Sequence, residues 1–215
     1  MTKKIKGVIL VIILVTIMTF IDIIGGFSYW VRSAIKLMLF GMIPYLYMLK
    51  NNIEMPTFKK DDNFNKILMF SILIIISFII GGTIFFKLGL LDSVKTSLSN
   101  SVGVSENNYI YVYIYIVTVN CTLEEFFFRH FALKFIRNTR YTILFSSILF
   151  SIYHTGMLRN MFLWYIFALS MLGLMIVGII FCLLNKNKNS ILNSTIVHLV
   201  ANFCINTIGL IVMYS

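Results

Sequence analysis

Long apolar runs alternate with short polar segments along the whole chain. A helix needs about 20 apolar residues to cross a bilayer, and runs in lipid must be helical because lipid offers backbone groups no partner. We therefore predict an all-α integral membrane protein with about seven transmembrane helices in one bundle around a polar intramembrane cavity. The predicted spans are 7–25, 34–49, 66–87, 109–135, 140–155, 161–184 and 190–213.

These spans are predicted to form one structural unit with two parts. Residues 1–108 hold helices 1 to 3 and a polar loop, 88–108, which is expected on the outer side. Three interpretations of this loop stay open, namely a lid, a short surface helix or a tether. Residues 109–213 hold helices 4 to 7, and the ionisable residues within the spans gather there.

Composition supports the membrane class and excludes others. Hydrophobic residues make up 59% of the chain and charged residues only 12%, well away from a soluble domain. The net charge of +10 comes from basic residues that lie between apolar runs. We therefore predict that the chain lies in a lipid bilayer and does not bind nucleic acid. Three cysteines in apolar segments, without a CxxC pattern, are typical of buried thiols.

The loop charges also predict an orientation. Lysine and arginine prefer cytoplasmic loops, and more of them fall on the inner side if the N-terminus is inside. The prediction is a cell-membrane protein with a cytoplasmic N-terminus and an external C-terminus. The inner side would hold Lys3, Lys4, Lys6, Lys50, Lys59, Lys60, Lys66, Lys134, Arg137, Arg140, Lys186 and Lys188, and the outer side Arg32, Lys36, Lys87, Lys95 and Arg159.

Ionisable residues inside the predicted spans are rare and concentrated in three helices. A charge at a helix centre costs about 2.5 to 3.5 kcal/mol on insertion scales, so such residues usually face the bundle interior and have a function. Those assigned to the spans are Glu124, Glu125, Arg129, His130, His154 and His198.

Helical spacing pairs the residues of the fourth span. Glu125 and Arg129 are four residues apart, in the order that favours an ion pair within one helix. Glu124 is then left without an obvious local partner. His130 matches no such pattern and is interpreted as structural.

The same spacing links residues in the two other helices. Phe150 and His154 share a face of the fifth span, so the phenyl ring is expected to line the pocket that receives the imidazole. His198 and Asn202 share a face of the seventh span. One glutamate, two histidines and one asparagine are therefore expected to converge.

This set of groups has the chemistry of amide hydrolysis. A buried carboxylate can act as a general base on water, imidazoles can share the proton transfer, and an amide can donate to an oxyanion. Glu124, His154 and His198 also lie within the ligand range of a catalytic zinc site, although the helical HExxH spacing is absent. A Zn²⁺ ion on these residues and a metal-free mechanism both stay open.

At these residues the chain resembles the CAAX protease and bacteriocin-processing (Abi) family of intramembrane peptidases. The three motifs of that family, EExxxR, FxxxH and HxxxN, stand here as "EEFFFR", "FSIYH" and "HLVAN". They occur in order on separate predicted helices. The resemblance covers residues 109–213, about half of the chain, and implies that they form the catalytic core.

The resemblance implies a role for each motif residue. Glu124 and His154 would activate the water, while His198 and Asn202 would stabilise the oxyanion. Glu125 and Arg129 would support the site, together with Phe150. Family members are described as metalloproteases, and a metal-free glutamate and histidine pair has also been argued.

The substrate implied by the resemblance is a membrane-associated peptide or protein. Related bacterial proteins are linked to bacteriocin immunity or peptide maturation, and the Ile, Lys and Asn content is typical of a bacterial chain. The chain has one span fewer after the last motif than the prenyl-protein enzymes of the family, and this difference argues against a prenylated CAAX substrate. The oligomeric state is not predicted.

Other classes stay open beside the endopeptidase. The charged residues would also suit a buried structural ion cluster, in a non-catalytic immunity protein or a scaffold. A proton-coupled carrier is a weaker alternative, because the paired broken helices and internal symmetry typical of transporters are not evident in the sequence.

Overall fold

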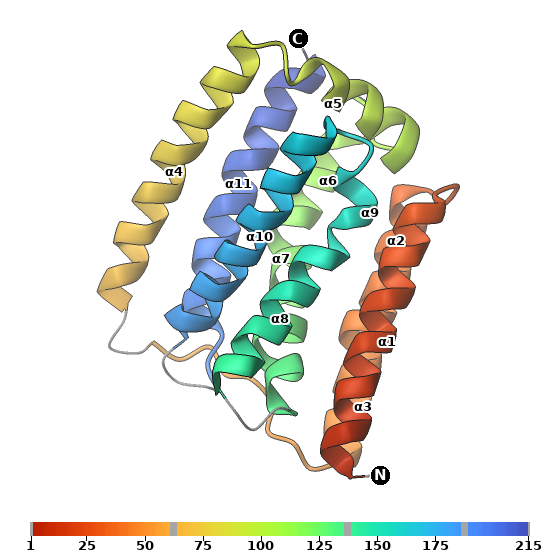
Figure 1. The fold of residues 1–215 in the computed structure, drawn as a ribbon, viewed down its shortest axis with the longest axis vertical. Helices are drawn as coiled ribbons and strands as arrows, with labels where there is room; N and C mark the ends of the chain where they lie inside the picture. Colours follow the sequence, from red (N-terminus) through yellow and green to blue (C-terminus); the bar gives the residue numbers. More distant parts are fainter. Residues whose placement is uncertain (1, 61–63, 136–138, 186–188, 215) are drawn as a thin grey trace.

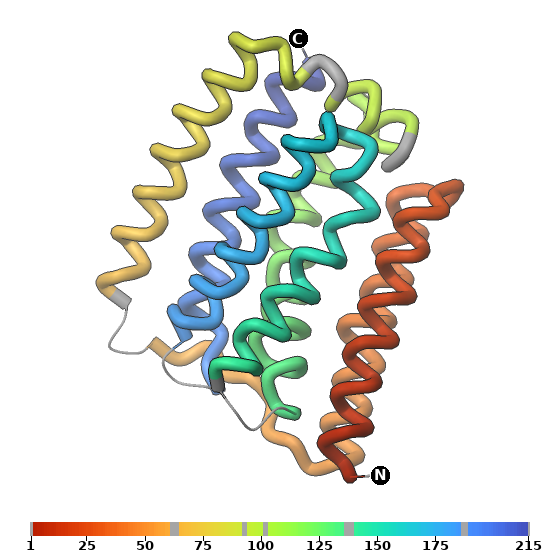
Figure 2. The backbone as a smooth tube through the Cα atoms, viewed as in Figure 1, coloured from red at the N-terminus to blue at the C-terminus, as the bar shows by residue number. Residues whose placement is uncertain are grey.

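The chain is a bundle of helices that run along one common axis in a computed structural model (Figure 1). The structure describes residues 2–60, 64–135, 139–185 and 189–214. Within these ranges it contains helices and one isolated β-bridge, between Thr57 and Ser190, and no strand of greater length. Figure 2 shows that α1 begins at one end of the bundle and α11 finishes at the other.

The helices alternate between long spans and short segments. The long ones are α1 (Lys3–Ile24), α4 (Phe64–Lys87), α8 (Thr139–Tyr153), α10 (Trp164–Leu184) and α11 (Leu192–Tyr214). A continuous helical run contains α2 (Tyr29–Lys36), the π-helix η1 (Leu37–Met42) and α3 (Ile43–Lys50). Another contains α6 (Tyr109–Tyr115), the π-helix η3 (Ile116–Asn120), α7 (Cys121–Glu124), the π-helix η4 (Glu125–Phe131) and the 3₁₀-helix η5 (Ala132–Lys134). The remaining segments are α5 (Asp92–Ser97), the π-helix η2 (Leu98–Val102) and α9 (Thr155–Leu158).

Six helices in the described residues are long and apolar enough to cross a membrane. The all-α integral membrane class is therefore confirmed. The count of seven is not confirmed, because the predicted span 34–49 is not among the six. It lies in the run from α2 to α3, where Arg32, Ser33 and Lys36 lower the apolar character of the first turns.

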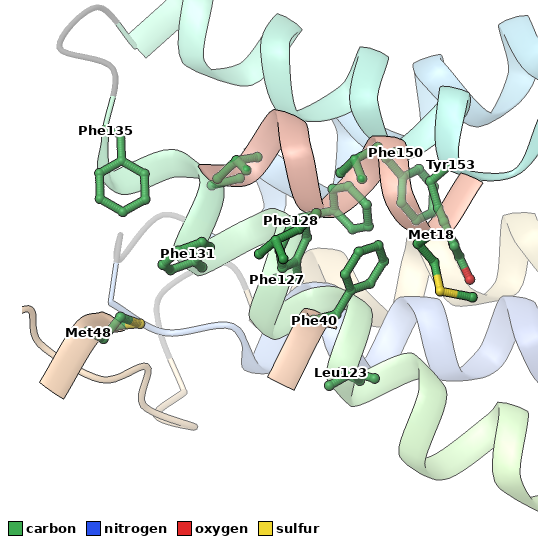
Figure 3. Close-up of a cluster of buried hydrophobic side chains, with 14 residues drawn as sticks. Met18, Phe40, Met48, Leu123, Phe127, Phe128, Phe131, Phe135, Phe150 and Tyr153 are labelled. Atoms are coloured by element: carbon green, nitrogen blue, oxygen red, sulfur yellow. The ribbon is translucent and has the colours of Figure 1, made fainter. Parts of the chain in front are cut away.

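A cluster of aromatic rings holds the first helices against the helix that carries Glu124. Phe40 of η1 stacks on Phe127 of η4, with ring centroids 4.2 Å apart. Phe128 packs edge-on against Phe150 of α8 at 5.3 Å, and Figure 3 shows these side chains together inside the bundle. Aromatic side chains contribute large buried areas and directional contacts, so this cluster fixes α8 and η1 beside Glu124.

On the other side, α8 packs closely against α10. A side chain at Gly178 of α10 would place its Cβ only 3.0 Å from the Cβ of Ser147. Small residues at such positions let membrane helices approach closely. The glycine therefore sets the spacing of two helices that line the site.

The polar segments at the two ends contain short ordered elements. In the predicted outer loop, α5 and η2 form a surface helix, one of the three interpretations of that loop. At the other end, the backbone N–H of Thr57 donates to the carbonyl of Asn189. Three of the charges used to predict orientation, Arg137, Lys186 and Lys188, lie outside the described residues. All three cysteines are free, and Cys121 and Cys182 are buried.

Candidate active site

Glu124 lies where the helix changes its winding. The short α-helical turn α7 ends at Glu124 and is flanked by the π-helices η3 and η4. π-Helical turns are rare and are frequent at functional sites. The adjacent carboxylates of Glu124 and Glu125 are both buried here, with 2% and 0% of their surfaces exposed.

The predicted ion pair between Glu125 and Arg129 is confirmed. Arg129 Nε lies 3.6 Å from Glu125 Oε1 within one helix. His198 of α11 is an additional and closer partner, since its Nδ1 lies 2.8 Å from the same oxygen. Glu125 thus links α11 to the helix that carries both glutamates.

Aromatic rings surround the Arg129 guanidinium. Its Cζ atom lies 4.2 Å from the Phe150 ring centroid and 5.3 Å from that of Phe181. In the described part of the chain, the Arg129 nitrogens have no hydrogen-bond acceptor. The cation therefore relies on Glu125 and on cation–π contacts, an arrangement suited to a fixed structural charge.

Glu124 has two partners that the sequence analysis missed. Its Oε1 accepts a hydrogen bond from Lys36 Nζ at 2.6 Å and one from Asn120 Nδ2 at 2.9 Å. Lys36 also donates to Asn120 Oδ1. The expectation that Glu124 has no obvious local partner is wrong, because Asn120 lies four residues away on the same helix. The assignment of Lys36 to the outer loop charges is also wrong, because Lys36 ends α2 and is only 5% exposed.

Two spacing signals were available for these partners. Asn120 and Glu124 are four residues apart on one helix, the spacing that pairs Glu125 with Arg129. Arg32, Ser33 and Lys36 share one face of α2, and all three are buried. A polar face within a membrane helix indicates contact with other polar groups rather than with lipid.

His198 lies between the two glutamates. Its Nδ1 contacts Glu125, while its Nε2 lies 3.6 Å from Glu124 Oε2. The Phe181 ring packs against the imidazole with centroids 5.1 Å apart. The two oxygens of Glu124 therefore have different neighbours. Oε1 accepts hydrogen bonds from Lys36 and Asn120, and Oε2 faces His198.

His154 approaches the cluster from the end of α8. Its Nδ1 lies 2.7 Å from the carbonyl oxygen of Phe150, and its ring packs edge-on against Phe150 and Tyr153 at 4.6 Å each. The imidazole is close enough to Glu124 for the two groups to interact electrostatically. The predicted contact between Phe150 and His154 is confirmed, and Nε2 is the ring nitrogen left for proton transfer.

Asn202 and His130 each contact a backbone carbonyl group in this structure. The Asn202 side chain donates to the backbone carbonyl of Ile116 at 3.3 Å, so in this structure its amide is directed at the backbone of η3. His130 is buried, and its Nε2 lies 2.8 Å from the carbonyl oxygen of Glu54. This contact agrees with a structural role for His130.

The predicted zinc ligands do not form a metal-binding set here. Among the residues that the structure describes, no three side chains of His, Cys, Asp or Glu are grouped to hold a metal ion. Glu124 Oε1 is already bonded to Lys36, a cation that would compete with a metal. A metal on Glu124, His154 and His198 stays a prediction.

Two cavities open near the ends of the bundle, and neither reaches these residues. One, of about 210 Å³, is lined by Lys3, Lys4, Tyr47, Asn51, Ile53, Lys134 and Phe135. The other, of about 410 Å³, is lined by Gly89, Leu90, Asn160, Met161, Phe162, Leu163 and Ile166. Glu124, Glu125 and His198 are themselves buried, with 2%, 0% and 5% of their surfaces exposed, so the cluster is closed to the surroundings in this conformation.

Together, the fold and the cluster define a multi-pass membrane protein with paired acids, bases and histidines in its interior. A family model described as Type II CAAX prenyl endopeptidase Rce1-like matches residues 106–204. The matched region, a little under half of the chain, is similar to the CAAX protease and bacteriocin-processing family, a family of proteases. The match contains all three motifs and excludes Lys36. Comparison with curated proteins and with solved structures gave no match.

Proposed function

We propose that the protein is an intramembrane endopeptidase that hydrolyses a peptide bond of a membrane-associated peptide or protein. The main support is the Glu124 carboxylate, which is buried beside two histidines and has one oxygen held by Lys36 and Asn120. A carboxylate held in this way is suited to accept a proton from water. The family match over the same residues supports peptide hydrolysis.

In the proposed reaction, water adds to the carbonyl carbon of the substrate while Glu124 Oε2 takes a proton from it. The carbonyl oxygen becomes an oxyanion, which His198 and Asn202 would stabilise by donating hydrogen bonds. The proton taken by Glu124 passes to His154, and as the C–N bond breaks His154 gives it to the departing amine, so both side chains return to their starting states. The products are a new carboxyl group and a new amine, so all atoms of the water are accounted for.

Asn202 would have to turn away from Ile116 to take its part. Its present hydrogen bond is long, at 3.3 Å, and therefore weak. The closed cluster also implies that helices separate before a peptide reaches Glu124. Glu125 and Arg129 support the site by holding His198 and the helix beside it.

The cellular role that we propose is bacteriocin immunity or peptide maturation at the cell membrane. The N-terminus would be cytoplasmic and the C-terminus external, as the loop charges indicate. A zinc-dependent form of the reaction remains a separate proposal. Zinc dependence is tested by the cleavage rate of the purified protein before and after treatment with a chelator. A loss of cleavage that added zinc restores would support it.

A second candidate function is a non-catalytic immunity protein or a scaffold. One observation favours it, namely that the charges of the cluster are paired and buried, with only 2% of the Glu124 surface exposed. Protection or signalling that survives the double variant Glu124→Ala/His154→Ala would establish this function and remove the protease.

The experiment that tests the proposed function compares membrane peptides from cells with the wild-type protein and with Glu124→Ala. We expect particular fragments in wild-type cells, and their intact precursors in variant cells. Glu106→Gln is the matched control, because Glu106 is exposed and pairs only with exposed Lys95 among the ion pairs found here. Identical peptide sets at equal protein levels would contradict a peptidase.

A further inference from the structure

The helix α2 turns its polar face inward. Arg32, Ser33 and Lys36 are buried, while Trp30 and Val31, on the other face, are about half exposed. A surface helix of a soluble protein shows the opposite arrangement, whereas ionisable residues of a membrane helix face the bundle interior and pair with other polar groups there. The interior next to α2 must therefore offer partners for these groups.

Lys36 finds its partners on the helix that carries the glutamates. Its Nζ atom bonds Glu124 Oε1 at 2.6 Å and Asn120 Oδ1, and it lies 4.4 Å from the centroid of the Tyr153 ring. A buried ammonium group is costly unless it is paired and further hydrogen-bonded. Both conditions are met here, so the pair has a well-defined geometry.

The consequence for Glu124 is that its two oxygens differ. Oε1 accepts from both Lys36 and Asn120, whereas Oε2 faces His198 Nε2 at 3.6 Å. Rotation of the carboxylate would break two hydrogen bonds, one of them with a charged donor. Oε2 is thereby kept on the side of His198.

We propose that Lys36 is a positioning residue for hydrolysis, which pairs with the Glu124 carboxylate and holds Oε1 so that Oε2 can take the proton of the attacking water. The proposal rests on the proposed endopeptidase function. It also extends the active site beyond residues 106–204, since Lys36 belongs to the N-terminal helices.

The test uses the full-length protein in liposomes and the substrate found by the peptide comparison. We expect Lys36→Met to lower kcat about 100-fold, as misplaced catalytic groups do, with KM changed less than about 2-fold. Lys36→Arg keeps the charge and should recover part of the loss. Lys50→Met is the control, because Lys50 is an exposed lysine at the end of α3 in the same helical run.

A double variant separates positioning from a general structural role. If Lys36 acts through Glu124, then Lys36→Met/Glu124→Gln should cleave no more slowly than Glu124→Gln alone. If Lys36→Met fails to fold, Asn120→Ala carries the test, since it removes the other donor to Oε1 without leaving a buried ion unpaired. We then expect a loss of kcat of about 10-fold at unchanged KM.

The outcomes distinguish this proposal from the proposed function. Wild-type kcat in folded Lys36→Met, or in Asn120→Ala where that variant is needed, overturns the role of Lys36 if Glu124→Gln is inactive. A raised KM at unchanged kcat overturns it too, because Lys36 would then bind substrate. Wild-type cleavage by Glu124→Gln instead overturns the peptidase mechanism itself.

Discussion

The two sides of the buried cluster hold their carboxylates in different ways. On one side, Glu125 is bound by Arg129 and His198, which lie within residues 106–204. On the other side, Glu124 is bound by Asn120 from the same helix and by Lys36 from α2. All the residues of the first side lie within the region that the family model matches, whereas the second side depends on Lys36 from a helix outside that region.

This difference suggests a division between structure and chemistry. Arg129 is enclosed by phenyl rings and has no hydrogen-bond acceptor in the described chain, so it is suited to holding helices together. Glu124 has one oxygen held and one directed toward His198, so it is suited to proton transfer. Adjacent residues with the same side chain thus have different expected roles.

The largest effect on stability is expected at the Glu125 side. Arg129→Met would leave the Glu125 charge buried without its arginine, and we expect unfolding to become easier by about 3 to 5 kcal/mol. Thermal unfolding of the purified protein in detergent measures this loss. Lys87→Met, at the exposed end of α4, is expected to unfold like the wild type.

The double variant Arg129→Met/Glu125→Gln sharpens this prediction. Because it removes both charges, it should regain part of the stability lost in Arg129→Met alone. If the double variant is as unstable as the sum of the two single variants, the ion pair does not have the structural role assigned to it.

A smaller effect, on rate rather than on stability, is expected at the Glu124 side. His154→Ala removes a ring whose identified hydrogen bond is to its own helix. We expect it to slow cleavage about 100-fold, or about 2.7 kcal/mol in activation free energy, with little change in unfolding temperature. His130→Gln is the matched histidine control and should cleave at the wild-type rate, and equal losses in both variants would contradict the assignment.

The membrane spans could be predicted because lipid allows so few solutions. Long apolar runs must be helical there, and six of the predicted spans correspond to helices that are long and apolar enough. The predicted span 34–49 is not among these six, for a physical reason. Its helix buries polar residues inside the bundle, so its composition no longer resembles that of a lipid-facing segment.

Contacts within one helix could also be predicted, and contacts between helices could not. The spacing of four residues located Glu125 with Arg129 and Phe150 with His154. The pairing of Lys36 with Glu124 joins residues 88 positions apart, and it depends on how α2 packs. A lysine near the end of an apolar run was counted as a loop charge, because charge counting contains no information on burial.

The most direct test of the account is cleavage by Glu124→Gln beside Glu106→Gln, each in liposomes with the same substrate peptide. The account predicts that Glu124→Gln folds but cleaves at least about 100-fold more slowly, since the general base is lost. Glu106→Gln should cleave like the wild type, because Glu106 is exposed. A folded Glu124→Gln protein with the wild-type rate would contradict the central claim that Glu124 activates the water.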